Sequence, residues 1–145
     1  MQVERLGTAN AQRACDAVRK LKTADGLRSL SPTTAEMLAF LQNPANLFLV
    51  ALEGDTPIGF AVSYVLDRVD GLQMMCLYEV AVEPRWRRHG VGTKLVSYVV
   101  SWRRDHDISK LWVLTNRSNT AAILLYASLG GVESAQGDNV LFEWR

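Results

Sequence analysis

The chain of 145 residues contains only two cysteines, Cys15 and Cys76, and only two histidines. Two cysteines this far apart make no disulfide framework, and neither has the closely spaced partner that a zinc site needs. So few histidines also leave no compelling Ser-His-Asp arrangement and no set of metal ligands. We therefore expect a reduced, cytoplasmic protein whose chemistry needs no bound metal ion.

Long apolar runs and an excess of one charge are also missing. No segment reaches the roughly 18 apolar residues of a membrane span, and the first residues lack the pattern of a signal peptide. The formal net charge of +1 gives no general attraction to nucleic acid or to an anionic membrane. The apolar share of 48% is that of an ordinary globular protein, and the length suits one domain over residues 1–145. We expect any polar partner to be recognised locally.

The spacing of apolar residues predicts a chain in which strands and helices alternate. Strands are expected at residues 2–5, 47–52, 58–69, 74–82, 111–114 and 140–144, and helices at 9–21, 33–43, 120–129 and for about 13 residues from Val91. Thr33 and Glu36 have the spacing of a capping box, which marks a helix start. Early strands follow one another directly, whereas later ones are joined through helices. We therefore expect an α/β or α+β fold: a mixed, mostly antiparallel sheet of about six or seven strands, flanked by about four helices.

A glycine-bearing segment, Arg87-Arg88-His89-Gly90-Val91-Gly92, joins the apolar run of residues 74–82 to the helix that starts at Val91. The first turn of a helix has unpaired backbone N–H groups and a partial positive charge, and glycine lets a ligand approach that backbone closely. The order of residues fits neither a dinucleotide-binding loop nor a P-loop. This junction is the predicted site of a phosphate-bearing cofactor.

Together with the preceding Val80-Ala81-Val82-Glu83-Pro84, the Arg-x-x-Gly-x-Gly segment resembles the acyl-CoA binding signature of the GCN5-related N-acetyltransferases (GNAT family). The resemblance implies acetyl-CoA as co-substrate, and a parallel pair of strands that splays apart to admit it. Arg88 departs from the family pattern, because a small residue is common there. A bulky side chain at this place alters the grip on phosphate but leaves the backbone donors intact.

The segment from Asn119 to Gly130 resembles a second signature of the family, Asn-x-x-Ala-x-x-x-Tyr-x-x-x-Gly. Asn119 and Tyr126 are seven residues apart, which places them two turns apart on one helical face. The resemblance implies that Asn119 holds the pantetheine arm and that Tyr126 protonates the departing thiolate as a general acid. The alternative is that Asn119 caps the helix and Tyr126 is a half-buried core aromatic. The residues assigned to cofactor binding are Val80, Val82, Arg87, Arg88, His89, Gly90, Val91, Gly92, Thr93, Asn119 and Tyr126.

Glu79 is the only charged residue in the apolar run of residues 74–82. A carboxylate in a buried strand usually has a raised pKa or faces a polar cleft, and it then suits a base that takes a proton from an ammonium nucleophile. An acid at this place often has that role in the family, directly or through a water. The alternative is that Glu79 faces solvent or pairs with an arginine. Cys76 is expected on the opposite face of the strand, which argues for direct attack by the amine without an acyl-enzyme.

The predicted activity is N-acetylation of a primary amine of a small molecule. Residues 63–66 and 77–93 look like the aminoglycoside N-acetyltransferases that modify the 3-amino group and give antibiotic resistance. Carboxylates for such a polycation could come from Asp67, Asp70, Glu79, Glu83 and Asp138. The alternatives are other small amines, polyamines, amino acids or a protein N-terminus, and, from another class, a non-catalytic acyl-CoA-binding module. Exposed edge strands also make a homodimer plausible.

Overall fold

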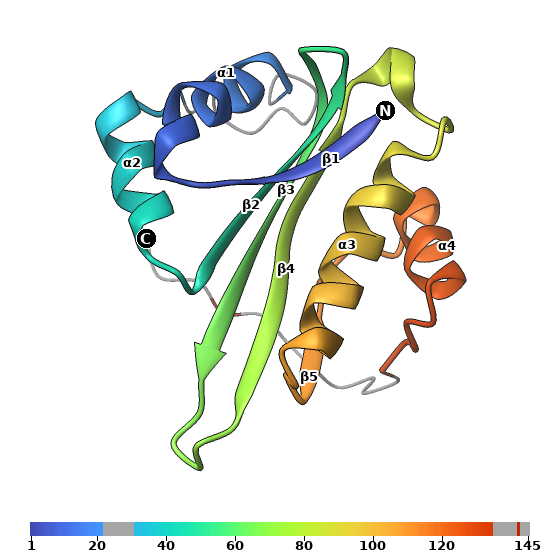
Figure 1. The fold of residues 1–145 in the computed structure, drawn as a ribbon. Helices are drawn as coiled ribbons and strands as arrows, with labels where there is room; N and C mark the ends of the chain where they lie inside the picture. Colours follow the sequence, from blue (N-terminus) through green and yellow to red (C-terminus); the bar gives the residue numbers. More distant parts are fainter. Residues whose placement is uncertain (22–30, 135–141, 143–145) are drawn as a thin grey trace.

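The computed structural model describes residues 1–21, 31–134 and 142, which form a twisted sheet with helices on both faces (Figure 1). The strands are β1 (Gln2–Leu6), β2 (Asn46–Glu53), β3 (Thr56–Asp67), β4 (Gln73–Val82) and β5 (Lys110–Trp112). The α-helices are α1 (Ala11–Leu21), α2 (Thr34–Gln42), α3 (Val91–Asp105) and α4 (Thr120–Ser128), with 3-10 helices at Thr8–Asn10 and Pro84–Trp86. The predicted mixed fold is confirmed, although the described residues form five strands rather than six or seven. The strand predicted at residues 140–144 lies, except for Phe142, outside the described residues.

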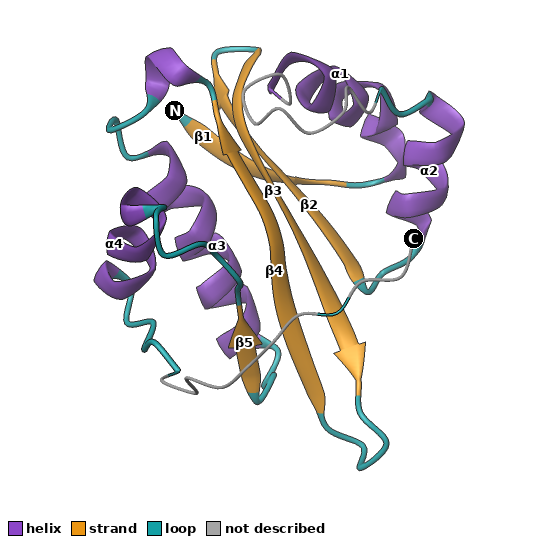
Figure 2. Cartoon of the chain, turned by 180° about the vertical axis from the view of Figure 1, so that it is seen from behind, coloured by secondary structure: helices purple, strands orange, loops and turns teal. Residues whose placement is uncertain are grey.

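The sheet has the strand order β1-β2-β3-β4-β5, and its first four strands are antiparallel neighbours. β5 is parallel to β4, as expected, and pairs only over Met74–Met75–Cys76 with Lys110–Leu111–Trp112. In the described part of the chain this ladder ends at Cys76, whereas β4 continues to Val82 (Figure 2). The parallel pair therefore opens along the second half of β4.

The two faces of the sheet are covered by different helices. α1 and α2 cover one face, and α3 covers the other with α4 beside it (Figures 1 and 2). Phe48 and Phe60 stack in the α1–α2 core, with ring centroids 5.5 Å apart, while Leu49 and Leu95 are fully buried in the α3 core. In the described regions, no helix combines the length and the apolar character that crossing a bilayer requires.

The helix starts follow from local sequence. The Thr33 hydroxyl accepts a hydrogen bond from the Glu36 N–H at 3.1 Å, and the Glu36 carboxylate accepts one from the Thr33 N–H at 2.8 Å. The predicted capping box is therefore confirmed. α3 begins at Val91, as predicted, directly after Gly90.

A β-bulge interrupts β4 at Tyr78. Val62 of β3 lies opposite Glu79, but the next residue, Ser63, lies opposite Leu77, so Tyr78 is an extra residue in the strand. The expectation that Cys76 and Glu79 lie on opposite faces is wrong for this reason. Cys76 lies opposite Tyr64, which is two residues along β3 from Val62. Because Val62 and Tyr64 lie on the same face of the sheet, their partners Glu79 and Cys76 share that face as well.

Candidate functional site

The N-terminus of α3 is an exposed set of backbone donors. Gly90 caps the helix with φ 80°, a left-handed conformation that favours glycine, although a Cβ at this position would meet nothing within 4 Å. The N–H of Lys94 makes the first hydrogen bond of the helix, to the Gly90 carbonyl at 3.0 Å. Helix geometry leaves the preceding N–H groups, through Thr93, directed out of the helix end. This end attracts anions by its donors and by its partial positive charge.

A cavity of about 670 Å³ lies between β4, α4 and this helix end. Every residue assigned to cofactor binding except His89 lines it: Val80, Val82, Arg87, Arg88, Gly90, Val91, Gly92, Thr93, Asn119 and Tyr126. Sequence reasoning missed the apolar wall that Trp86, Leu124 and Leu125 contribute. The sequence could have indicated the two leucines, because they directly precede Tyr126 on the same predicted helix. Gly92 keeps this wall close, because a Cβ there would lie 3.2 Å from Leu125 Cδ2.

His89 lies outside this cavity. Its Nδ1 is 2.8 Å from the Arg87 carbonyl oxygen, and its ring meets that of Trp86 edge-on at 5.8 Å. The ring lines a separate hollow of about 480 Å³ together with Glu53 and Glu83.

Arg88 has a left-handed backbone with φ 62°. A residue with a Cβ is strained in this conformation, which explains why a small residue, above all glycine, suits this position. The neighbouring Arg87 has φ −63°, and its Nε donates a hydrogen bond to the Val82 carbonyl at 3.4 Å. Arg87 therefore ties the loop to the end of β4, and both arginines line the cavity.

Asn119 caps α4 and also lines the cavity. Its Oδ1 accepts a hydrogen bond from the Ala122 N–H at 3.2 Å, so the helix-cap interpretation is confirmed. The residue is also exposed to the cavity. Because the cap uses only Oδ1, the side-chain NH₂ group can donate to a ligand.

Tyr126 is half-buried, packed against the α3 core and on the cavity wall. Burial raises the pKa of its phenol above the ordinary value of 10.0. The hydroxyl therefore holds its proton at neutral pH, as a general acid must.

Glu79 lines a second hollow, of about 380 Å³, at the place where β4 parts from β5. The side chain is half-buried. Val80, Asn119 and Tyr126 line both this hollow and the larger cavity, so the two spaces adjoin. A ligand held at the helix end can reach along β4 towards the carboxylate.

Three of the other carboxylates expected near Glu79 lie elsewhere. Asp67 accepts a hydrogen bond from Gln73 at 2.9 Å and Asp70 pairs with Arg68 at 2.6 Å, both at the tip of the β3–β4 hairpin. Glu83 follows β4, where hydrogen bonds from Arg85 and then the charge of Lys20 lower its pKa. Asp138 is outside the described residues. Of the acids that the structure describes, Glu79 is the one that lines the second hollow.

Cys76 is buried on the same face as Glu79. Burial raises the pKa of its thiol above the ordinary value, which keeps the group protonated and a weak nucleophile. Cys76 is therefore unreactive, although it lies on the same face of the sheet as Glu79.

Comparisons with known proteins agree with this geometry. The model of the Acetyltransferase (GNAT) family matches residues 11–130. The [ribosomal protein bS18]-alanine N-acetyltransferase of Escherichia coli (strain K12) is 34% identical over 71 residues, which are 49% of this chain and 45% of that protein. The chain thus spans about half the length of such relatives.

Solved structures share the fold. An aminoglycoside acetyltransferase, meta-AAC0020, from an uncultured soil metagenomic sample superposes with a TM-score of 0.87 at 20% identity, over 99% of this chain and 96% of that one. Aminoglycoside N-acetyltransferase AAC(6')-Iy in complex with CoA superposes with a TM-score of 0.73 at 20% identity, over 99% and 93% of the chains.

Proposed function

The chain belongs to the GNAT family of acetyltransferases, and on this premise we propose that it transfers the acetyl group of acetyl-CoA to a primary amine of a small molecule. The observation that carries the proposal is that the cavity at the α3 N-terminus adjoins the hollow of Glu79. One end offers backbone donors and two guanidinium groups for an anion. The other end offers a carboxylate near a neutral phenol.

The cavity residues fit the parts of coenzyme A. The free N–H groups of Val91, Gly92 and Thr93 suit a diphosphate, and the side chains of Arg87 and Arg88 add positive charge. The volume of about 670 Å³ lies within the range of known ligand sites. The open edge of β4 offers the backbone groups of Val80 and Val82 to the pantetheine amides. Bound acetyl-CoA would supply an acetyl group activated as a thioester.

Two side chains would move protons in the transfer. The Glu79 carboxylate would accept the proton that an ammonium must lose before it can attack, directly or through a water. The Tyr126 hydroxyl would donate a proton to the departing sulfur. Since the Cys76 thiol stays protonated, the amine itself is the nucleophile.

The acceptor has two candidates. The names of the structural neighbours support an aminoglycoside, although the expected group of carboxylates does not surround Glu79 in the described residues. The name of the Escherichia coli relative supports the N-terminus of a protein as the second candidate. A screen of thiol release from acetyl-CoA with aminoglycosides, polyamines, amino acids and peptides would separate them.

Replacing Glu79 by Gln tests the proposed chemistry. The variant keeps the shape of the side chain but removes the base, so kcat should fall by about 10²- to 10⁴-fold while the Kd for acetyl-CoA stays within about twofold. Asp67→Asn, at the hairpin tip, is the matched control and should leave kcat unchanged. Unchanged turnover in Glu79→Gln would contradict a base at this position. No transfer by the unmodified protein to any amine would favour the non-catalytic binding module.

A further inference from the structure

The bulge in β4 brings an aromatic ring next to the carboxylate. Leu77 and Val80 pack in the α3 core, so the two residues between them, Tyr78 and Glu79, both belong to the opposite face. Without the extra residue, neighbours in a strand would point to opposite faces. Tyr78 and Glu79 also line one hollow, together with Leu77 and Val80.

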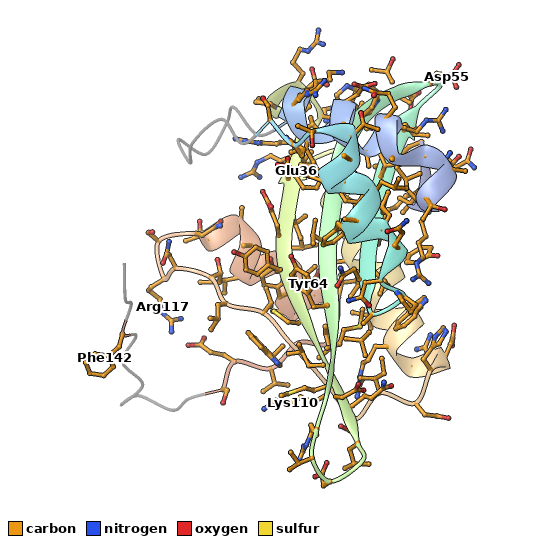
Figure 3. The ribbon with its side chains drawn as sticks, turned by 90° about the vertical axis from the view of Figure 1, so that its left-hand side faces the viewer. Glu36, Asp55, Tyr64, Lys110, Arg117 and Phe142 are labelled. Atoms are coloured by element: carbon orange, nitrogen blue, oxygen red, sulfur yellow. The ribbon has the colours of Figure 1, made fainter. Side chains whose placement is uncertain are left out.

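Tyr78 is the outermost of three aromatic side chains. Its ring meets the Tyr64 ring edge-on at 5.5 Å, and Tyr64 meets Phe40 of α2 edge-on at 5.9 Å. Figure 3 shows Tyr64 over the strands beside α2. We call Phe40, Tyr64 and Tyr78 the aromatic wall. The rings of Phe40 and Tyr64 are half-buried and support the ring of Tyr78. Tyr78 itself is 69% exposed and presents its ring to a ligand.

The hollow beside the aromatic wall has little charge. Glu79 is its one acid among the described residues, and its other lining includes Leu77, Leu114, Thr115 and Asn116. The segments outside the described residues contain as many basic as acidic side chains. Their charged residues are Lys22, Asp25, Arg28, Asp138, Glu143 and Arg145, which are three bases and three acids. A polycation is attracted by an excess of negative charge, and the described lining of the hollow offers the single carboxylate of Glu79.

We propose that the aromatic wall determines acceptor specificity, and that it selects a primary amine with one positive charge next to an apolar group over a polycationic amine. This inference rests on the proposed function. The ammonium would lie between Glu79 and the ring of Tyr78, since aromatic faces attract cations, and the apolar group would lie along the ring. Burial, followed by the nearby Tyr78 and Glu79, raises the pKa of Tyr64, so that ring stays neutral in this surrounding.

The test compares kcat/KM for 2-phenylethylamine, spermidine and sisomicin. The unmodified protein should prefer 2-phenylethylamine by at least about tenfold, the factor that 1.4 kcal/mol gives. Tyr78→Ala should raise the KM for 2-phenylethylamine by about tenfold with kcat retained, while ethylamine, which loses only the contact of its ammonium with the ring, changes less than about threefold. Tyr78→Phe should restore the KM, because the ring is kept. The control is Leu72→Ala, which replaces an exposed apolar residue at the hairpin tip and should leave the KM for 2-phenylethylamine and for ethylamine unchanged.

The outcomes separate the two proposals. A preference for sisomicin or spermidine, or an equal loss for all amines in Tyr78→Ala with the Kd for acetyl-CoA unchanged, would overturn the role of the aromatic wall alone. Absence of transfer to every amine by the unmodified protein would overturn the proposed function itself. A peptide that begins with phenylalanine has the same chemistry at its N-terminus, and its kcat/KM relative to 2-phenylethylamine tells which source the site takes.

Discussion

Arg88 and Gly90 both adopt a left-handed backbone conformation, which strains Arg88 but not Gly90. Both have positive φ, 62° and 80°, on either side of His89. Glycine adopts this conformation without strain, whereas a residue with a Cβ loses about 1–2 kcal/mol. The loop at the mouth of the cavity is therefore held in shape partly against the preference of Arg88.

Replacing Arg88 by Gly should raise the free energy of unfolding, by up to about 1 kcal/mol, because the relief of strain exceeds the entropy that glycine adds to the unfolded chain. Arg87→Gly is the control: Arg87 is also exposed but has φ −63°, so the same change should lower stability by about 0.5–1 kcal/mol through backbone entropy, and further through the lost hydrogen bond to Val82. Urea denaturation measures both. An equal decrease of the free energy of unfolding in Arg88→Gly and Arg87→Gly would argue against strain at residue 88.

Tyr126 gives a prediction about pH. A general acid works only while protonated, and since burial raises the pKa of Tyr126 above 10.0, the midpoint of any loss of activity from its ionisation should lie above pH 10. Tyr126→Phe should lower kcat by about 10²-fold or more at neutral pH, with little change in the Kd for acetyl-CoA. A profile of kcat against pH checks this. A fall of kcat that begins below pH 9 and disappears in Tyr126→Phe would contradict the account.

At the scale of whole elements, the sequence predicted what depends on local patterns. The capping box at Thr33 and the start of α3 after Gly90 follow from a few neighbouring residues, and both were found where expected. The parallel pairing of β5 with β4 follows from the helix between them.

The bulge at Tyr78 could not be predicted. Residues 74–82 are nearly all apolar, so no alternation shows where the register shifts, and no glycine marks the place. The directions of Glu79 and Cys76 depend on that one extra residue. The positions of Asp67 and Asp70 were also misjudged. Both lie at the tip of the β3–β4 hairpin, where their side chains pair with Gln73 and Arg68.

The close approach of α3 to the sheet depends on Gly59 of β3. A Cβ at this position would lie 2.8 Å from Val91 Cγ1, 3.0 Å from the Ala81 carbonyl oxygen and 3.2 Å from Leu95 Cδ1. Gly59→Ala should therefore lower the free energy of unfolding by about 1–3 kcal/mol and weaken acetyl-CoA binding, because it pushes the first turn of α3 away.

Gly7→Ala is the control for Gly59. Gly7 has φ −114° and open space around its Cα, so alanine should be neutral or stabilise by up to about 1 kcal/mol. Thermal denaturation and calorimetric titration with acetyl-CoA measure both effects. If Gly59→Ala behaves like Gly7→Ala, α3 does not depend on this contact.

At the scale of the whole molecule, function follows from the way one sheet opens. β5 leaves β4 after Cys76, and among the described residues no strand pairs with this edge of the second half of β4, which leads from Glu79 to the N-terminus of α3. α4 closes the opposite side with Asn119 and Tyr126. The anion-binding end and the proposed chemistry are thus joined by a single strand edge, and the aromatic wall lies at its far end.

The most direct test of the central claim is a calorimetric comparison of coenzyme A with pantetheine, which lacks the diphosphate and the nucleotide. If the helix end and its guanidinium groups hold the diphosphate, coenzyme A should bind at one site per chain and at least about 100-fold more tightly than pantetheine, a difference of about 2.7 kcal/mol. Equal affinities, or no heat with coenzyme A, would contradict the account.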